Sequence, residues 1–307
     1  MKVQIHGAST LRSFTDSITN GFLEAGSDVV TRNPDVHFIQ VHSSPESLLE
    51  DLEILKATEH ITKAIFLFHR PDEFLLHEHM KTFFNDRKVP IVLFGDLVQS
   101  EFWNHRKDET RIIPHPFFNL ARPSLSYDEK IIVGAWTNWG EMRNLEHFFK
   151  LCSAIKKIDL DKRFSFYAGG FLKGKLLDNK ILQSELMKLP MNDGPAIEHS
   201  EEIFIPHFNT QLFHLNGKKR LGESSGSLHR GITIPVIFEA NRAEEIENIK
   251  AIKIHADDEL TVIDFGRAAQ EIVGLTDDGY EKWLQFNLRS AQHNLPVDFA
   301  RKILSLK

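Results

Sequence analysis

The sequence predicts an α/β protein made of two units, each built on a parallel sheet. Short apolar runs alternate with segments of helical periodicity, which is the order expected of strands connected by helices. Several runs are continuously apolar rather than alternating, and that pattern is typical of strands covered on both faces. The chain has 307 residues. That length is enough for two domains of about 150 residues each.

The first half of the chain predicts four strands and three helices. Strands are expected at residues 3–5, 36–41, 63–68 and 90–96. Helical spacing covers residues 11–25, 47–56 and 73–85. Gly26 follows the first helical segment and is a predicted helix stop, because glycine readily adopts the left-handed conformation that ends many helices.

Polar residues stand at the ends of these first-half strands. His6 and Gly7 end the first strand, His69 and Arg70 end the third, and Asp96 ends the fourth. In open α/β sheets, ligands bind outside the carboxyl ends of the strands. We therefore expect a ligand-binding edge at these residues.

A polar segment with one proline, residues 119–129, is the predicted linker to the second half. There, a strand that ends at Val133 leads into a loop over residues 134–144 and a helix that begins at Leu145. Further strands are expected near residues 164–168, 202–205, 212–215, 234–238 and 251–254. Residues 280–307 predict one or two terminal helices, interrupted near Pro296.

The run Gly-Glu-Ser-Ser-Gly-Ser-Leu, residues 222–228, puts a carboxylate and small residues at the expected start of a short helix. A helix start offers unpaired N–H groups and the positive end of the helix dipole to a phosphate. Serine and glycine let a ligand approach closely, and the carboxylate of Glu223 can hold a sugar hydroxyl. The run therefore favours a sugar-diphosphate site, while a plain turn with a helix cap is the alternative.

The order of elements in the second half resembles the donor-binding half of the GT-B glycosyltransferases, especially the retaining family 4 type. The resemblance covers roughly residues 111–275, including a segment before the linker, Arg-Ile-Ile-Pro-His-Pro-Phe. It implies two Rossmann-like domains that face each other across a cleft, with a C-terminal helix bridging back. The implied parts are residues 1–122 on the acceptor side, residues 123–285 for donor binding, and a helix over residues 286–307 that packs toward the N-terminal domain.

This resemblance also implies roles for individual residues. Glu223 would lie beside the donor sugar, and Arg143 would offset the charge of the leaving diphosphate. The implied donor-binding positions are Gly134, Ser224, Ser225, Gly226, Ser227 and Leu228. Lys219 and Glu239 are added as candidate donor-binding residues. The strand-end residues His6, Gly7, His69 and Arg70 would form the acceptor side. Asp96 and His115 are further candidates for the catalytic centre, and either Asp96 or a histidine would be the base of an inverting reaction.

Two positions depart from the family pattern. Gly231 stands where the family has a second glutamate for the ribose hydroxyls, and Glu239 is a candidate substitute. Ala135 stands where a basic residue normally follows the strand's glycine. The basic cluster at residues 218–220, which contains Lys219, is the candidate replacement. These departures leave the identity of the donor open.

Composition and missing motifs argue against several other classes of protein and kinds of site. A net charge of −6 does not favour a broad nucleic-acid surface, and the single cysteine, Cys152, excludes an intrachain disulfide. The sixteen histidines show no His-Glu-x-x-His spacing, so no metal site is expected. No Gly-x-Gly-x-x-Gly follows the first strand, which disfavours a dinucleotide oxidoreductase. No secretion signal or membrane span is visible, and a cytoplasmic location is expected.

The predicted function is transfer of a sugar from a nucleotide-diphosphate donor, such as a UDP- or GDP-sugar, to an acceptor hydroxyl. The family likeness implies a retaining, metal-independent reaction without a cofactor, on a glycan or another hydroxyl acceptor. Two alternatives stay open. One is a GT-B-like protein that binds a nucleotide sugar or a glycan without turnover, and the other is a transferase that glycosylates modified bases in nucleic acid.

Overall fold

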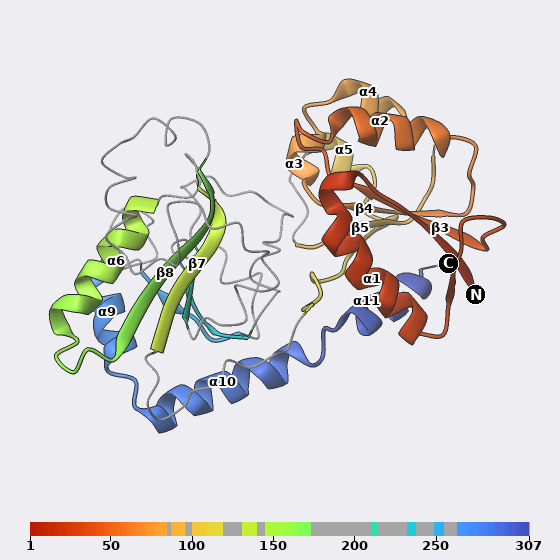
Figure 1. Cartoon of the computed structure of the whole chain (residues 1–307). Helices are drawn as coiled ribbons and strands as arrows, with labels where there is room; N and C mark the ends of the chain where they lie inside the picture. The colour runs from red at the N-terminus through yellow and green to blue at the C-terminus, as the bar shows by residue number, and fades with distance from the viewer. Residues whose placement is uncertain are drawn as a thin grey trace. The chain divides into compact units, whose positions relative to one another are not determined.

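The computed structural model describes residues 1–84, 87–95, 100–118, 131–139, 145–172, 210–213, 232–237, 249–254 and 263–306. The chain forms two compact units (Figure 1). Of the described residues, 1–118 and 293–306 belong to the first unit, and 131–292 belong to the second. The first unit therefore contains both ends of the described chain.

The first unit is built on a six-stranded parallel sheet with the order β2-β1-β3-β4-β5-β6. Its strands are β1 (Lys2–His6), β2 (Asp28–Val29), β3 (Val36–Val41), β4 (Ala64–Phe68), β5 (Ile91–Leu93) and β6 (Thr110–Ile112). The register aligns Val3 with Val36, and Phe66 with Ile91. The predicted parallel sheet of the first half is confirmed.

Helices cover both faces of this sheet with their apolar side chains, as the continuously apolar strands require. On one face, Phe38 and Leu67 pack with side chains of α1 (Arg12–Glu24) and α11 (Pro296–Leu304). On the other face, Ile39 and Phe66 pack with side chains of α2 (Leu48–Ala57), α3 (Pro71–Phe74), α4 (Glu78–Thr82) and α5 (Glu101–Asn104). Figure 1 shows α1 and α2 on opposite sides of the central strands.

The helix predicted over residues 73–85 is divided into α3 and α4. A continuous helix would place Phe74 and Met80 about 120° apart around its axis. Both side chains are fully buried in the same core, which the break at Leu75–His77 permits. Leu76, inside the break, is 78% exposed. The prediction of one helix was therefore wrong because burial of both apolar side chains outweighs helical continuity.

Helix α1 ends as predicted at Gly26, which has a φ of 80°. The N–H of Gly26 donates to the carbonyl of Leu23, and the N–H of Ser27 donates to the carbonyl of Phe22. This pair of bonds is the Schellman arrangement, which satisfies carbonyls at a helix C-terminus. The chain can then turn directly into β2.

The C-terminal helix α11 packs against α1, so the predicted return of the chain end to the first unit is confirmed. Gly21 on α1 makes this contact close, because a methyl group at its Cα would lie 2.4 Å from the carbonyl oxygen of Pro296. Pro296 begins α11, as a proline at the first position of a helix can. Phe299, Ala300 and Ile303 of α11 then complete the core beside α1.

The second unit contains a five-stranded parallel sheet with the order β11-β10-β9-β7-β8. Its strands are β7 (Ile131–Trp139), β8 (Phe164–Leu172), β9 (Thr210–Phe213), β10 (Ile234–Ile237) and β11 (Ile252–Lys253). Its described helices are α6 (Leu145–Ile158), α9 (Phe265–Val273) and α10 (Asp277–Ala291). Residues from α6, α9 and α10 pack with β7, β8 and β10 in one core, so this half is also an α/β unit.

One local prediction in the second unit is corrected by β7. The segment from Gly134 onward was expected to form a loop, but β7 continues to Trp139. Gly134 lies inside the strand and pairs with Tyr167 of β8 and Gln211 of β9. The long partner strand β8 supports this extension, since β7 and β8 pair over nine residues, from Ile131↔Phe164 to Trp139↔Leu172.

Candidate functional site

The carboxyl ends of the first-unit strands bring several polar residues to one edge of the sheet. Gly7 follows β1, His42 follows β3, His69 and Arg70 follow β4, and His115 lies three residues after β6. A short 3₁₀ turn, η1 (Ser9–Leu11), connects the β1 end to α1. This edge is where ligands bind in open α/β sheets, and we take it as the candidate site.

His69 is buried in a ring of aromatic side chains. Its imidazole contacts Phe14 edge-on at a centroid distance of 4.7 Å and Phe94 at 5.2 Å. The ring of His42 lies 6.0 Å away. Burial, together with the nearby His42, His115 and Arg70, holds the pKa of His69 well below its usual value. The ring is therefore neutral at physiological pH.

The Nε2 atom of His69 is buried and has no hydrogen-bond partner among the described residues. A buried polar atom without a partner is uncommon, because its lost hydration is not replaced. On a neutral imidazole, this nitrogen can donate or accept a single hydrogen bond. His69 therefore keeps a ring nitrogen able to form a hydrogen bond among apolar side chains.

His115 lies against the same aromatic side chains as His69. Its ring is 4.6 Å from that of Phe94 and 5.2 Å from that of Phe14. The Nδ1 atom is 2.9 Å from the carbonyl oxygen of Pro116. The structure thus brings together His69 and His115, two residues predicted for the site.

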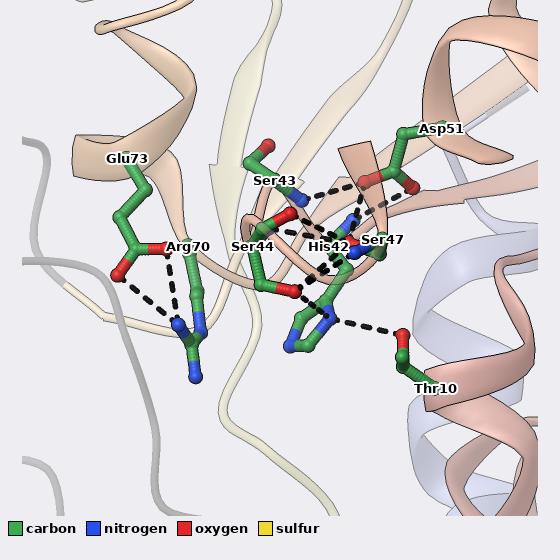
Figure 2. A network of polar contacts seen from close by, with 8 residues as sticks. All are labelled: Thr10, His42, Ser43, Ser44, Ser47, Asp51, Arg70 and Glu73. Carbon is green, nitrogen blue, oxygen red and sulfur yellow. Dashed lines mark hydrogen bonds and ion pairs between the residues drawn. The ribbon is translucent and has the colours of Figure 1, made fainter. Parts of the chain in front are cut away.

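Arg70, also predicted for the site, forms an ion pair with Glu73. Its Nη1 donates to both carboxylate oxygens of Glu73, at 3.1 and 3.0 Å. Both side chains are partly exposed, at 27% and 17%. The pair holds the guanidinium beside the β4 end, as Figure 2 shows.

His6, in contrast, is turned away from His69. Val3 and Ile5 pack on the α1 face of the sheet, so the alternation along β1 directs His6 to the opposite face. There its Nε2 lies 2.9 Å from Nδ1 of His37. Burial and the neighbouring His37 lower the pKa of His6 to about 4. The sheet therefore separates His6 from the histidines after β4 and β6.

Gly7 leaves little room for a side chain at the end of β1. A methyl group at its Cα would lie 3.0 Å from Nε2 of Gln40, a fully buried side chain on β3. Gln40 in turn donates to the hydroxyl of Thr15 on α1. The absence of a side chain at Gly7 therefore leaves room for Gln40 of β3 beside the end of β1.

A polar network at the end of β3, drawn in Figure 2, is not evident from the sequence pattern. Its members are Thr10, His42, Ser43, Ser44, Ser47 and Asp51. His42 follows a predicted strand, so the strand-end criterion that selected His69 could have found it. The serines and Asp51 carried no such signal, because their contacts form only when α2 packs beside the β3 end.

Asp51, 1% exposed, anchors this network from the first turn of α2. Its carboxylate accepts hydrogen bonds from the N–H groups of Ser43, at 2.8 Å, and His42, at 3.2 Å. The Ser47 hydroxyl donates to it at 2.9 Å. Burial raises the pKa of Asp51, and these three donors oppose that shift. Ser43 has a φ of 62°, an uncommon value for a residue other than glycine, and its N–H bond to Asp51 holds the turn.

Contacts also join the loop after β1 to this network. The hydroxyl of Thr10 and that of Ser44 each lie 3.1 Å from Nδ1 of His42. The N–H and the hydroxyl of Ser9 both donate to Glu50 on α2. The two loops at this edge are therefore held together by side chains.

Most residues predicted for the donor side lie outside the described residues. These are Arg143, Lys219, Glu223, Ser224, Ser225, Gly226, Ser227, Leu228 and Glu239, together with Asp96 of the first unit. Gly134 is described and lies in β7, where it is buried. The donor-side assignments stay predictions.

Two further observations concern metals and membranes. Among the described residues, no group of three or more histidine, cysteine, aspartate or glutamate side chains could hold a metal ion. Within the same residues, no helix has both the length and the apolar character needed to cross a membrane.

Comparison with known proteins gives similarity in structure without similarity in sequence. No protein-family model matches the chain, and no curated protein matches it. Anabaena HepE, solved in complex with UDP and glucose, matches with a TM-score of 0.57 and 12% identity. The match covers 99% of this chain and 98% of HepE.

Two other solved structures extend the comparison. A UDP-forming trehalose-phosphate synthase from Burkholderia xenovorans, in complex with glucose-6-phosphate, matches with a TM-score of 0.59 and 8% identity, over 96% of this chain and 78% of that one. Staphylococcus aureus TarM, solved with UDP, matches with a TM-score of 0.58 and 12% identity, over 88% of this chain and 55% of that one. The chain has the α/β fold of the GT-B glycosyltransferases, with parallel Rossmann-like sheets.

Proposed function

We propose that this protein is a glycosyltransferase that moves a sugar from a nucleotide-diphosphate donor to an acceptor hydroxyl. The observation that carries the proposal is a GT-B fold over nearly the whole chain, combined with polar side chains at the carboxyl edge of the first sheet. HepE and TarM were both solved with UDP, which supports a uridine or related nucleotide as the leaving group. The proposal includes a retaining, metal-independent reaction of the family 4 type and a cytoplasmic location.

We assign a separate binding role to each half of the chain. Residues 1–122 bind the acceptor, residues 123–285 bind the donor, and residues 286–307 return to the first domain. Arg143 and the predicted helix start at residues 224–228 offset charge on the leaving diphosphate. The hydroxyl of the acceptor attacks the anomeric carbon, and its proton leaves to the departing phosphate oxygen. Catalysis then depends on positioning and on charge stabilisation at the leaving group.

Turnover of the Glu223→Gln variant tests the proposal. Glu223 is proposed to contact the donor sugar in the transition state, so removing its charge lowers turnover by about 100-fold or more. Affinity for UDP or GDP alone changes little, because those ligands lack the sugar. The assay is release of nucleotide diphosphate and of transferred sugar from a panel of UDP- and GDP-sugars. Glu53→Gln, which removes a charge from an exposed position on α2, is the matched control.

The same assay separates the proposal from its alternatives. A protein that binds nucleotide sugars without turnover would be stabilised by them and would release no nucleotide diphosphate, even by donor hydrolysis. A transferase for bases in nucleic acid would bind duplex DNA with an affinity that falls steeply as salt increases. Near-normal turnover of Glu223→Gln with the true donor would remove Glu223 from the catalytic centre.

A further inference from the structure

The ion pair between Arg70 and Glu73 lies at the carboxyl edge of the first sheet, directly after β4. We propose that Glu73, by neutralising Arg70, makes this edge select an uncharged hydroxyl compound as the acceptor and reject its phosphorylated counterpart. The inference rests on the proposed function for the role of the ligand as an acceptor. The charge of the edge is a property of the protein without substrate.

Arg70 is the cationic side chain of the two segments that follow β3 and β4. The register places Val41 opposite Phe68, so residues 42–51 and 69–74 leave the sheet beside each other. All residues of these two segments are described, and Arg70 is the only lysine or arginine among them. A guanidinium suits a phosphate well, because its N–H groups match pairs of phosphate oxygens. A phosphorylated acceptor bound by these segments would therefore depend on Arg70.

Glu73 already occupies this guanidinium. Arg70 Nη1 donates to both carboxylate oxygens of Glu73, at 3.1 and 3.0 Å. Arg70 caps α3 and Glu73 lies in its first turn, a spacing of three residues that brings the two side chains together, as Figure 2 shows. A phosphate on Arg70 would lie beside the Glu73 carboxylate, and repulsion between the two anions opposes its binding.

Other acidic residues add to this effect. The same two segments contain Glu46, Glu50 and Asp72 besides Glu73, and we leave Asp51 out of the comparison because burial raises its pKa. Acidic residues in a first turn offset a helix dipole, but a helix N-terminus carries only about half a positive charge. Four carboxylates against one guanidinium exceed what the N-termini of α2 and α3 offset. The excess is negative and repels a phosphate ester, which carries about −1.5 to −2 charges at pH 7.

His69 offers a hydrogen-bonding group at the same edge without a positive charge. Its side chain is buried and neutral, and its Nε2 has no hydrogen-bond partner among the described residues. The rings of Phe14 and Phe94 beside it cannot neutralise an anion. An uncharged hydroxyl that reaches Nε2 completes its hydrogen bonding. A phosphate there would lose hydration without gaining a counter-charge.

Titration with inorganic phosphate tests the role of Glu73 without turnover. NMR of the arginine side-chain N–H groups in the full chain follows binding, and Arg70→Gln assigns the Arg70 signal. We expect Glu73→Gln to bind phosphate at Arg70 about tenfold more tightly than the wild type, because a like charge has been removed beside the ligand. Equal affinity in the two proteins would overturn the inference.

Glu271→Gln is the matched control for this titration. It removes the carboxylate of the Arg267–Glu271 pair, a partly exposed ion pair on α9, and leaves Arg70 paired with Glu73. We expect no gain of phosphate affinity at Arg70 in this variant. If Glu73→Gln does not fold, Glu73→Ala makes the same test, and the exposure of the pair favours folding of either variant because partly exposed ion pairs contribute little stability.

Paired acceptors test the selectivity in the proposed reaction. Glucose and glucose-6-phosphate differ only in the phosphate group, as do glycerol and glycerol-3-phosphate. We expect kcat/KM of the wild type to be about tenfold higher for the uncharged member, and Glu73→Gln to reduce this preference through a lower KM for the phosphorylated member. A wild-type preference for a phosphorylated member would overturn the inference. If the wild type releases no nucleotide diphosphate from any donor, the proposed function fails, while the phosphate titration still decides the charge selectivity of the edge.

Discussion

Replacing Gly21 with alanine would separate two helices that now touch through their backbones. Gly21 lies on the buried face of α1, opposite the first residue of α11. The added methyl carbon would lie 2.4 Å from the carbonyl oxygen of Pro296 and 2.5 Å from its carbonyl carbon. Ordinary van der Waals contact begins near 3.4 Å, so α11 must move by about 1 Å. A rotamer change cannot relieve the overlap, because the atoms belong to the backbone.

Two opposing effects determine how much Gly21→Ala changes the free energy of unfolding. Alanine favours a helix interior over glycine by about 1 kcal/mol. Overpacking costs about 1–3 kcal/mol, and the upper part of that range applies because the neighbour is backbone. We therefore expect Gly21→Ala to lower the free energy of unfolding by about 2 kcal/mol. For a domain of this size, that corresponds to a fall in Tm of roughly 4–8 °C.

Urea unfolding of Gly21→Ala, followed by circular dichroism, measures this loss. Asn20→Ala is the matched control, because it raises helix propensity at the adjacent, exposed position without a clash. Hydrogen exchange adds a local test, and amides of α11 around Phe299 should exchange faster in Gly21→Ala. Stability equal to or above that of the wild type would show that α11 does not lie against Gly21, and would refute the reasoning.

Three further predictions follow from single side chains. His69→Phe should reduce the loss of folding stability at acid pH, because the pKa of His69 is depressed in the folded state and the wild type therefore loses up to about 1.4 kcal/mol per pH unit as the pH falls below about 6.5. Urea unfolding from pH 7.5 to 5.5 measures this dependence, and the same slope in both proteins would contradict it. Asn287→Ala removes bonds to the backbone of Thr233 and Lys250 and should cost about 2–4 kcal/mol; a urea midpoint within error of the wild type would contradict the buried bonds. Arg143→Ala should weaken the thermal stabilisation by UDP or GDP, and equal shifts in both proteins would show that Arg143 is not a phosphate ligand.

The fold was predictable where a local pattern and tertiary burial agree. β3 and β4 match their predicted positions closely, because strands covered on both faces are continuously apolar in sequence. The break between α3 and α4 was not predictable, since it depends on where Phe74 and Met80 meet the sheet. The length of β7 likewise depends on pairing with β8, a partner that starts 33 residues later in the chain.

The candidate site was predictable only for residues that stand at strand ends. His69, Arg70 and His115 satisfied that criterion, or lay near it, and the structure brings the two histidines against Phe94. His6 satisfied it as well, but the alternation along β1 turns its side chain to the opposite face. Asp51 could not be predicted as a buried residue. In the sequence it is an acidic residue near a helix start, and only tertiary packing buries it.

The contribution of α11 to the first unit has a consequence for synthesis of the protein. Residues 1–118 leave the ribosome long before Pro296 to Leu304, yet Phe299, Ala300 and Ile303 fill part of the core of that unit. At about 5–20 residues per second, the delay is roughly 10–40 seconds. During that interval the apolar face of α1 lacks its partner, so the nascent first unit exposes a surface suited to chaperones. The core of the N-terminal unit is therefore completed only after the second unit has been synthesised.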